Sequence, residues 1–148
     1  MERTVENLEQ ELKTEHDLYL RALADFENYR RRIDRAREQL GKEGLRKFLL
    51  PLLDVIDDFE RFLKAVENES SPFINGMRVV HSKLMQVLES EGVLPFKSIS
   101  ERFDPFMHEA VATATAGEYP LSTIVEEVRR GYKWGDEVLR TARVVVAM

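Results

Sequence analysis

The sequence predicts an α+β protein with a long, paired coiled-coil helix, a helical-bundle segment and a small C-terminal β domain. Three observations lead to this prediction. Apolar residues recur every seven positions over residues 5–40, apolar residues spaced by three and four follow as far as residue 88, and proline, glycine and β-branched residues become frequent after Gly92. The first pattern is typical of a coiled coil, the second of bundle helices and the third of short strands with turns.

The heptad repeat predicts the first helix and its pairing. Only Glu15 interrupts its apolar character, and no proline or glycine precedes Gly41. A single helix over residues 3–40 would extend for roughly 50 Å. The remaining chain is too short to cover such a helix, so pairing with a second copy of the same helix is favoured over packing on the protein's own core. The residues expected to pair are Leu12, Tyr19, Ala22, Phe26, Tyr29, Ile33 and Leu40.

A second helix is expected from Leu45 to about Val66. Gly41 and Gly44, just before it, predict a kink or a short loop. Pro51 should bend or end this helix locally unless it lies in the first turn.

A third helix is expected after the turn at residues 70–72. Ser71 and Pro72 are typical of an N-cap and a first helical residue, and Gly92 is typical of a left-handed C-terminal cap. Two such helices from each of two chains would form a four-helix bundle. Its expected contacts are Ile56, Phe59, Leu63 and Leu84.

The C-terminal third is expected to form a compact β domain. Strands are predicted at Glu109–Thr115, Thr123–Trp134 and Val138–Ala147, with a hairpin turn at Gly135 and Asp136. The last strand should place Val138, Arg140, Ala142, Val144 and Val146 on one face. The predicted division of the chain is therefore 1–44, 45–92 and 93–148.

Composition limits the classes of function. The formal net charge is -5, charged residues make up 33% and hydrophobic residues 43%, and cysteine is absent. The absence of cysteine excludes disulfides, zinc–cysteine sites and thiol catalysis. No apolar stretch is long enough to span a membrane and the charged N-terminus does not resemble a signal peptide, so a cytoplasmic protein is expected.

The sequence gives little support for catalysis, a metal site or a cofactor. His16, His81 and His108 do not have the spacing of a two-histidine metal site, and the chain has no glycine-rich phosphate loop. His16 and His81 are interpreted as solvated or polar-face helix positions. The acidic cluster of Asp57, Asp58 and Glu60 is interpreted as a solvated surface. We therefore expect a protein that is not an enzyme.

An arginine cluster lies at the end of the first helix. Arg30, Arg31, Arg32, Arg35 and Arg37 fall within eight residues. A basic region that contacts nucleic-acid phosphates would have this composition. Residues 1–47, however, hold eleven basic and eleven acidic side chains, and the heptad repeat continues through the cluster. A solvated face and an arginine-rich protein interface therefore remain as alternatives.

Four segments in order resemble the GrpE family, the nucleotide exchange factors of DnaK-type chaperones. They are Phe26–Arg32, Leu49–Leu63, Phe103–Val111 and Gly131–Val146, and together with the predicted architecture they cover the chain from about residue 17. The resemblance implies a homodimer with parallel long helices, a four-helix bundle and a β domain on each chain. It implies that the dimer binds the chaperone's nucleotide-binding domain and opens its cleft, so that ADP leaves, and that the factor needs no nucleotide site of its own.

Site residues follow from the same resemblance. It places chaperone contacts at Arg30, Arg31, Phe103, Pro105, Met107, Val128 and Val146. For Val128 and Val146, a place in the β-domain core is an equal alternative. Asp104 and His108 are expected to hold the loop rather than to touch a partner.

The chain departs from the family pattern at several positions. Gln39 replaces a common lysine, Glu137 a common arginine after the hairpin turn, and Thr141 a common proline. Gln39 lies at a helix contact that the resemblance implies, and the other two changes lie around the hairpin of the β domain. Two other functions remain open: a coiled-coil nucleic-acid-binding protein that uses the cluster from Arg30 to Arg37, and a dimeric scaffold without exchange activity.

Overall fold

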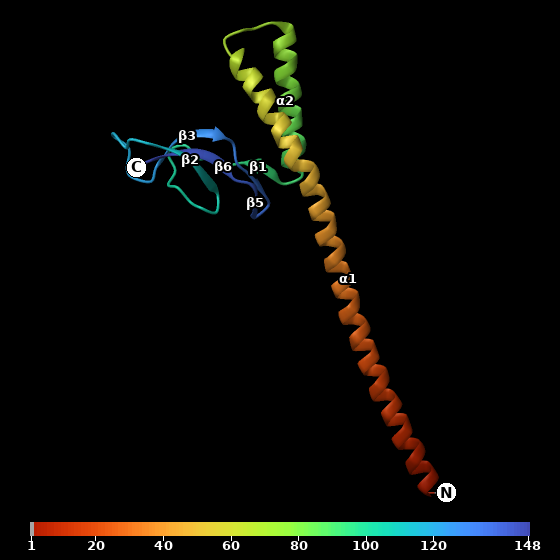
Figure 1. Cartoon of the computed structure of the whole chain (residues 1–148). Helices are drawn as coiled ribbons and strands as arrows, with labels where there is room; N and C mark the ends of the chain where they lie inside the picture. Colours follow the sequence, from red (N-terminus) through yellow and green to blue (C-terminus); the bar gives the residue numbers. More distant parts are fainter. Residues whose placement is uncertain (1) are drawn as a thin grey trace. The chain divides into compact units, whose positions relative to one another are not determined.

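The structure, a computed structural model, describes residues 2–148 apart from the side chain of Arg3 (Figure 1). It divides into two compact units, Met1–Leu45 and Arg46–Met148. Met1, where the expected segment 1–44 begins, lies outside the described residues. Helices occupy the first part of the chain and short strands the last, which confirms the α+β fold class. The three-part division into 1–44, 45–92 and 93–148 stays a prediction.

Helix α1 spans Glu2–Ala65 without interruption, so the expectation of a short loop at Gly41 and Gly44 and of two separate helices is wrong. Added Cβ atoms at these two glycines would meet nothing within 4 Å. Glycine costs an exposed helix interior only about 1 kcal/mol. Pro51 also lies inside α1, where it removes one backbone hydrogen bond. Its neighbours Leu49 and Leu53 are 3% and 0% exposed, so packing of this face offsets that loss.

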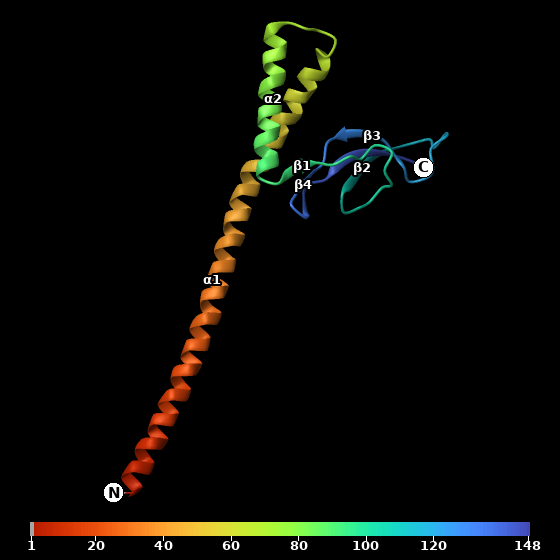
Figure 2. The same ribbon diagram turned by 180° about the vertical axis from the view of Figure 1, so that it is seen from behind.

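Helix α2 spans Pro72–Ser90 and begins as the sequence predicts. The Ile74 N–H donates to Ser71 Oγ over 3.1 Å, and Pro72 occupies the first turn, where its missing N–H needs no partner. Gly92 follows the helix with φ of +80°. Figures 1 and 2 show α2 running back alongside the last turns of α1, so the two helices form a hairpin.

Six short strands in residues 2–148 form two three-stranded sheets. The strands are β1 (Val93–Pro95), β2 (His108–Ala114), β3 (Ile124–Arg129), β4 (Tyr132–Trp134), β5 (Glu137–Arg140) and β6 (Ala142–Ala147). One sheet has the order β1-β4-β5, with antiparallel pairs, and the other has the order β2-β6-β3. In the second sheet β6 pairs parallel to β2 and antiparallel to β3. The expected hairpin turn is present between β4 and β5, with Gly135 at φ of +60°.

Two of the expected strands are each divided between the two sheets. The strand expected at Thr123–Trp134 breaks into β3 and β4 before Gly131, and the strand expected at Val138–Ala147 breaks into β5 and β6 at Thr141. An added Cβ at Gly131 would overlap the Phe96 ring and lie 2.7 Å from the backbone nitrogen of Ala142. Close packing at the crossing point therefore requires glycine. Because of this division, Arg140 and Ala142 do not share one strand face as expected.

Each sheet belongs to its own apolar core. The first core joins the helical hairpin to sheet β1-β4-β5, and its buried members are Leu49, Leu53, Ile56, Leu88, Val93, Tyr132 and Leu139. The second core lies against sheet β2-β6-β3, and its buried members are Ile124, Ala142, Val144 and Val146, with Phe96 and Phe103 packed against them. The helical hairpin and the first sheet therefore bury each other's apolar side chains and depend on one another for stability.

Candidate functional site

The arginine cluster occupies an exposed part of α1. Arg30, Arg31, Arg32, Arg35 and Arg37 are all exposed. Asn28, Arg31, Arg32 and Arg35 line a shallow hollow of about 320 Å³. Such guanidinium groups can form bidentate contacts with carboxylates or phosphates. In the part of the chain that the structure describes, none of these arginines forms an ion pair with a carboxylate.

The loop before β2 presents an aromatic side chain from a fixed backbone. The Phe106 N–H donates to Asp104 Oδ1 over 3.0 Å, and the Asp104 N–H donates to His108 Nδ1 over 3.0 Å. His108 is 5% exposed, so it anchors the loop from the interior. These contacts confirm that Asp104 and His108 hold the loop. The Phe106 side chain, in contrast, is 86% exposed.

The residues expected to contact a chaperone differ in their accessibility. Pro105 is exposed and Val128 is 57% exposed, so Val128 is not part of the core. Phe103 and Met107 are half-buried, and Phe103 packs against the second core. Val146 is 6% exposed within that core. The expected contact at Val146 is therefore corrected to the core alternative, because a buried side chain offers almost no surface to a partner.

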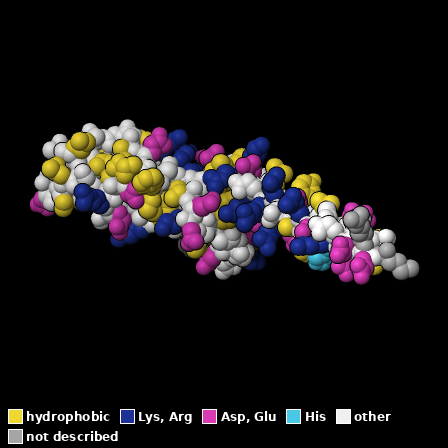
Figure 3. Space-filling model, turned by 90° about the horizontal axis from the view of Figure 1, so that it is seen from below, with side chains coloured by type: hydrophobic (Ala, Val, Ile, Leu, Met, Phe, Trp, Pro, Cys, Tyr) yellow, Lys and Arg dark blue, Asp and Glu magenta, His cyan; other side chains and the backbone are white. Residues whose placement is uncertain are grey.

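Phe106 is a highly exposed aromatic residue of this loop that sequence reasoning did not select. It lies between Pro105 and Met107, which the resemblance did select. Phe106 directly follows Pro105 and lies between Asp104 and His108, the two residues that fix the loop. This pattern is the signal that could have identified it. Other exposed apolar side chains of the β domain are Leu94, Ile99, Val111, Tyr119, Leu121 and Met148. Figure 3 shows apolar side chains distributed over this domain.

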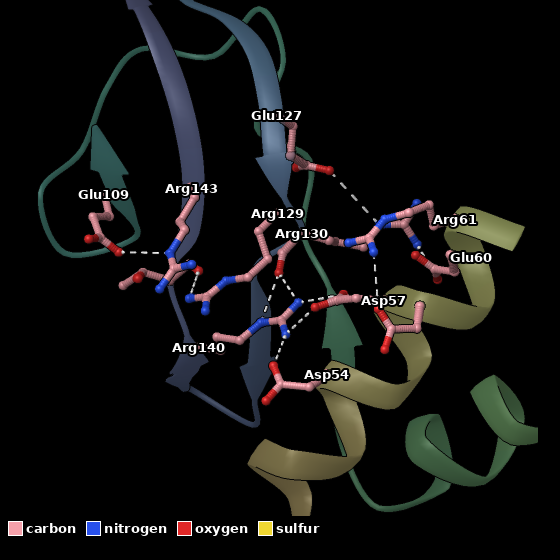
Figure 4. Close-up of polar contacts among 12 residues, drawn as sticks. Asp54, Asp57, Glu60, Arg61, Glu109, Glu127, Arg129, Arg130, Arg140 and Arg143 are labelled. Atoms are coloured by element: carbon pink, nitrogen blue, oxygen red, sulfur yellow. Dashed lines mark hydrogen bonds and ion pairs between the residues drawn. The ribbon is translucent and has the colours of Figure 1, made fainter. Parts of the chain in front are cut away.

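A buried ion pair connects α1 to β5. Arg140 Nη1 donates to Asp57 Oδ2 over 2.7 Å and Nη2 donates to Asp57 Oδ1 over 2.8 Å (Figure 4). The Arg140 side chain is 5% exposed, donates also to the Arg130 carbonyl, and lies over the Tyr132 ring. Asp54 Oδ1 lies 3.5 Å from the same guanidinium. The expectation that Asp57 belongs to a solvated acidic surface is therefore wrong.

Glu60 forms a second connection between helices and strands. Its Oε1 accepts from Arg130 Nη1 over 3.1 Å and lies 3.1 Å from His81 Nε2 of α2. The His81 ring is stacked on Phe59, with centroids 5.8 Å apart. Glu60 and His81 are thus partly buried partners and not solvated positions. Only Asp58 of the acidic cluster fits the solvated interpretation, since it is 74% exposed and pairs with the exposed Arg61.

Burial shifts the pKa values of two groups near these contacts. Desolvation raises the pKa of Tyr132 to about 12, and Glu60 adds to this effect. Desolvation, together with the positive charges of Arg140 and Arg143, lowers the pKa of Arg129 below its usual value. The raised pKa keeps Tyr132 uncharged at neutral pH, and the lowered pKa of Arg129 reflects an environment that disfavours its positive charge.

The residues expected to pair on α1 before Leu45 are accessible. Leu12, Tyr19, Phe26, Tyr29 and Leu40 are between 58% and 71% exposed. Ala22 is exposed as well, and Ile33 is half-buried. This helical unit therefore displays an uncovered apolar stripe, as a paired helix requires.

The bundle contacts expected from the sequence are only partly accessible. Ile56 is 0% exposed inside the first core, and Leu84 packs against that core, so Ile56 cannot serve as a dimer contact. Phe59 and Leu63 are half-buried. Two other series with heptad spacing are exposed instead, which we call the bundle stripes: Phe48, Val55 and Phe62 on α1, and Phe73, Val80 and Val87 on α2.

The departures at Glu137 and Thr141 have local partners in this chain. Arg46 Nη2 donates to Glu137 Oε2 over 3.2 Å, and the Arg46 guanidinium also lies over the Trp134 ring. The Thr141 carbonyl accepts from Arg129 Nη2 over 3.2 Å. Both positions therefore support the packing of the β domain.

Residues 2–148 show neither a metal site nor a membrane-spanning helix. No group of three or more His, Asp or Glu side chains is arranged to hold a metal ion in this part of the chain. None of the described helices is long and apolar enough to cross a membrane.

Comparison with known proteins identifies one family. The family model described as GrpE matches residues 1–148. "Protein GrpE" of Synechococcus sp. (strain JA-2-3B'a(2-13)) is 39% identical over 99% of the chain and 63% of its own length. The proteins of the same name from Geobacillus kaustophilus and Chlamydia pneumoniae are 41% and 35% identical, with 68% and 82% of their lengths covered.

The chain spans about three fifths of the length of the two Synechococcus relatives, 63% and 60%. The match nevertheless extends over both structural units, and it includes the arginine cluster, the helical hairpin and the β domain described above. The chain belongs to the GrpE family.

Proposed function

We propose that the chain is a homodimeric co-chaperone that binds the nucleotide-binding domain of a DnaK-type chaperone and accelerates ADP release. The match to the GrpE family over residues 1–148 is the observation that supports this proposal most strongly. The activity itself is what the family resemblance implies. The proposal places the protein in the cytoplasm, and a cysteine-free sequence is compatible with that reducing compartment.

The mechanism requires no catalytic group. A factor that binds the open form of a nucleotide cleft more tightly than the closed form shifts the chaperone towards the open form. ADP prefers the closed form, so each ligand lowers the affinity for the other. On this account the protein is not an enzyme, and the exchange mechanism requires neither a nucleotide site nor a cofactor on the protein itself.

Each structural unit carries a candidate contact surface for the chaperone. On α1, Arg30 and Arg31 are exposed and lack carboxylate partners in the described chain. On the β domain, Pro105, Phe106 and Val128 are exposed on a backbone fixed by the sheet and by the Asp104–His108 contacts. A rigid apolar surface loses little entropy on binding, and arginine and aromatic residues contribute most to interfaces of this kind.

The homodimer is supported by the apolar surface left uncovered in one protomer. The heptad stripe before Leu45 and both bundle stripes are exposed, and all three recur every seven residues. A heptad repeat is the spacing with which one helix packs along another. We therefore place the dimer contacts at these stripes, with Phe48, Val55, Phe62, Val80 and Val87 taking the role first expected for Ile56 and Leu84.

Reciprocal linkage tests the proposed activity. The affinity of the protein for a purified DnaK-type chaperone would be measured by calorimetry with the chaperone free of nucleotide and saturated with ADP. We expect ADP to weaken this affinity by the same factor by which the protein weakens ADP binding. Equal affinity in both states would contradict the mechanism, since a ligand without differential affinity shifts no equilibrium.

One observation favours a second candidate function. The hollow lined by Arg31, Arg32 and Arg35 could contact nucleic-acid phosphates. This alternative requires binding to DNA or RNA with an affinity that falls steeply as salt is raised. Duplex binding of that kind, without any effect on ADP release, would favour it over the exchange function.

A further inference from the structure

A cleft lies where the end of α1 faces strands β3 and β6. Its volume is about 630 Å³. Five cationic side chains line it, together with the carboxylates of Asp57, Glu60 and Glu127. The cations are Arg61, Lys64, Arg129, Arg130 and Arg143, and we call this feature the cationic cleft.

The three carboxylates of the cleft already have cationic partners. Asp57 binds Arg140, and Glu60 binds Arg130 and His81. Glu127 lies 3.9 Å from Arg130 Nε. Each of these carboxylates therefore already lies beside a cation other than Arg129 or Lys64.

Arg129 and Lys64 are the cations that remain without a carboxylate. Arg129 Nη2 donates to the carbonyl of Thr141, while Arg129 Nε is buried and has no hydrogen-bond partner among the described residues. Figure 4 shows the Arg129 guanidinium among those of Arg140 and Arg143. Lys64 enters the cleft from the last turn of α1, and no ion pair of its ammonium group is found in residues 2–148. A buried donor without an acceptor and two like-charged neighbours together favour an anionic acceptor beside Arg129.

We propose that the cationic cleft binds a phosphate-type oxyanion through Arg129 and Lys64. A tetrahedral oxyanion accepts several hydrogen bonds at once, and a guanidinium offers donors in a matching planar arrangement. A bound oxyanion would also bridge α1 and β3, and so stabilise the packing of the second sheet beside the helical hairpin. Inorganic phosphate and the phosphate tail of a nucleotide share this chemistry.

NMR of the full chain tests the site directly. The Nε–Hε signal of Arg129 would be followed during titration with inorganic phosphate and, separately, with ADP, at a constant ionic strength set with chloride. Assignment comes from the signal lost in Arg129→Lys. We expect a saturable shift of this signal with at least one of the two ligands. Saturation by phosphate, by ADP or by both identifies the source of the oxyanion, and each of these results supports the site.

Variants separate a site from general charge effects. Lys64→Gln should weaken the affinity by about 10-fold or more, because it removes a charge-assisted hydrogen bond. Arg102→Gln is the matched control, since Arg102 is an exposed cation of the β domain outside the cleft. This variant should bind phosphate or ADP with the same affinity as the wild type. The proposal is overturned if neither ligand gives a saturable shift, if chloride alone reproduces it, or if Lys64→Gln titrates like the wild type. Lys64 is exposed, so this variant tests the proposal even if a change at Arg129 disturbs folding.

Discussion

Asp57 of α1 and Arg140 of β5 form a bidentate ion pair that is largely buried, although they are 83 positions apart in the sequence. Arg140 also donates two hydrogen bonds to the carbonyl of Arg130, which lies in the segment between β3 and β4. The ring of Tyr132 lies beneath its guanidinium. One side chain thus connects the helical hairpin with the strand crossing of the β domain. The positions of the β-domain surfaces proposed to contact a chaperone depend on this pair.

Removal of the Asp57 charge should destabilise the protein. Asp57→Asn leaves the buried Arg140 without its bidentate partner, and we expect a loss of about 2 to 4 kcal/mol in the free energy of unfolding. Urea denaturation followed by circular dichroism measures this change. Asp58→Asn is the matched control, because Asp58 is 74% exposed and should change stability by less than about 0.5 kcal/mol. Equal effects of the two variants would show that the ion pair does not stabilise the fold.

Local sequence signals predicted the elements that depend on local chemistry. Ser71 and Pro72 mark the start of α2, and Gly92 and Gly135 mark turns with positive φ. The unbroken course of α1 through Pro51 could not be predicted in this way, because packing of the flanking leucines decides it.

Long-range contacts explain the remaining differences. The division of the expected last strand at Thr141 follows from the crossing of two sheets beside Gly131, and no periodicity within the strand reports this crossing. The partner of Asp57 likewise becomes visible only in the folded chain. Ile56 and Val55 both fit an apolar helix pattern, and only the fold shows that Ile56 is buried in the protomer while Val55 is exposed.

The bundle stripe on α2 should be required for dimerisation. Val80→Asp combined with Val87→Asp would place charges in a desolvated helix interface, so we expect dissociation to monomers in sedimentation velocity. Gln86→Asp is the control, since residue 86 is exposed and lies outside the stripe. Persistence of the dimer in the double variant would contradict this interface.

The heptad stripe of the first helical unit gives a parallel prediction. Phe26→Asp with Ile33→Asp should abolish or strongly weaken the dimer, because paired carboxylates would be buried between the helices. Sedimentation over a range of concentrations measures the change. An unchanged association constant would show that this stripe is not a dimer contact.

The arginine cluster should contribute to chaperone affinity without contributing to stability. Arg30→Ala with Arg31→Ala should weaken chaperone binding by about 1 to 3 kcal/mol. Both side chains are exposed, so the thermal melting profile should stay nearly unchanged. Calorimetric titration gives the affinity, and a parallel assay with duplex DNA at two salt concentrations tests the nucleic-acid alternative. Unchanged chaperone affinity would remove these arginines from the proposed interface.

Tyr132 should make stability depend on alkaline pH. Its folded pKa of about 12 lies above the unfolded value of 10.0, so its contribution to stability is complete below pH 10 and declines as pH rises towards 12. Tyr132→Phe should therefore show a weaker alkaline loss of stability than the wild type. At pH 7 this variant should be within about 1 kcal/mol of the wild type, since the Tyr132 hydroxyl has no hydrogen-bond partner among the described residues. Urea denaturation at several pH values measures both effects, and identical pH profiles would contradict the assignment.

The β domain is best tested by surface variants rather than by truncation. A chain ending at Gly92 would lose Val93, Tyr132 and Leu139, and would so expose the core face of the helical hairpin. Phe106→Ala with Val128→Ala removes exposed apolar side chains and leaves both cores intact. We expect this variant to remain folded and dimeric, with a rate of ADP release reduced by about tenfold or more. Glu126→Ala, an exposed change on the same strand as Val128, is the control and should keep the wild-type rate.

Stopped-flow release of a fluorescent ADP analogue from a DnaK-type chaperone tests the exchange function most directly. The chaperone would be loaded with the analogue and mixed with excess unlabelled ATP, with and without this protein at increasing concentration. The proposed mechanism predicts a release rate that rises with protein concentration and saturates when every chaperone is bound. A release rate that remains at its spontaneous value, measured at concentrations where calorimetry shows the complex to be formed, would contradict the proposed function.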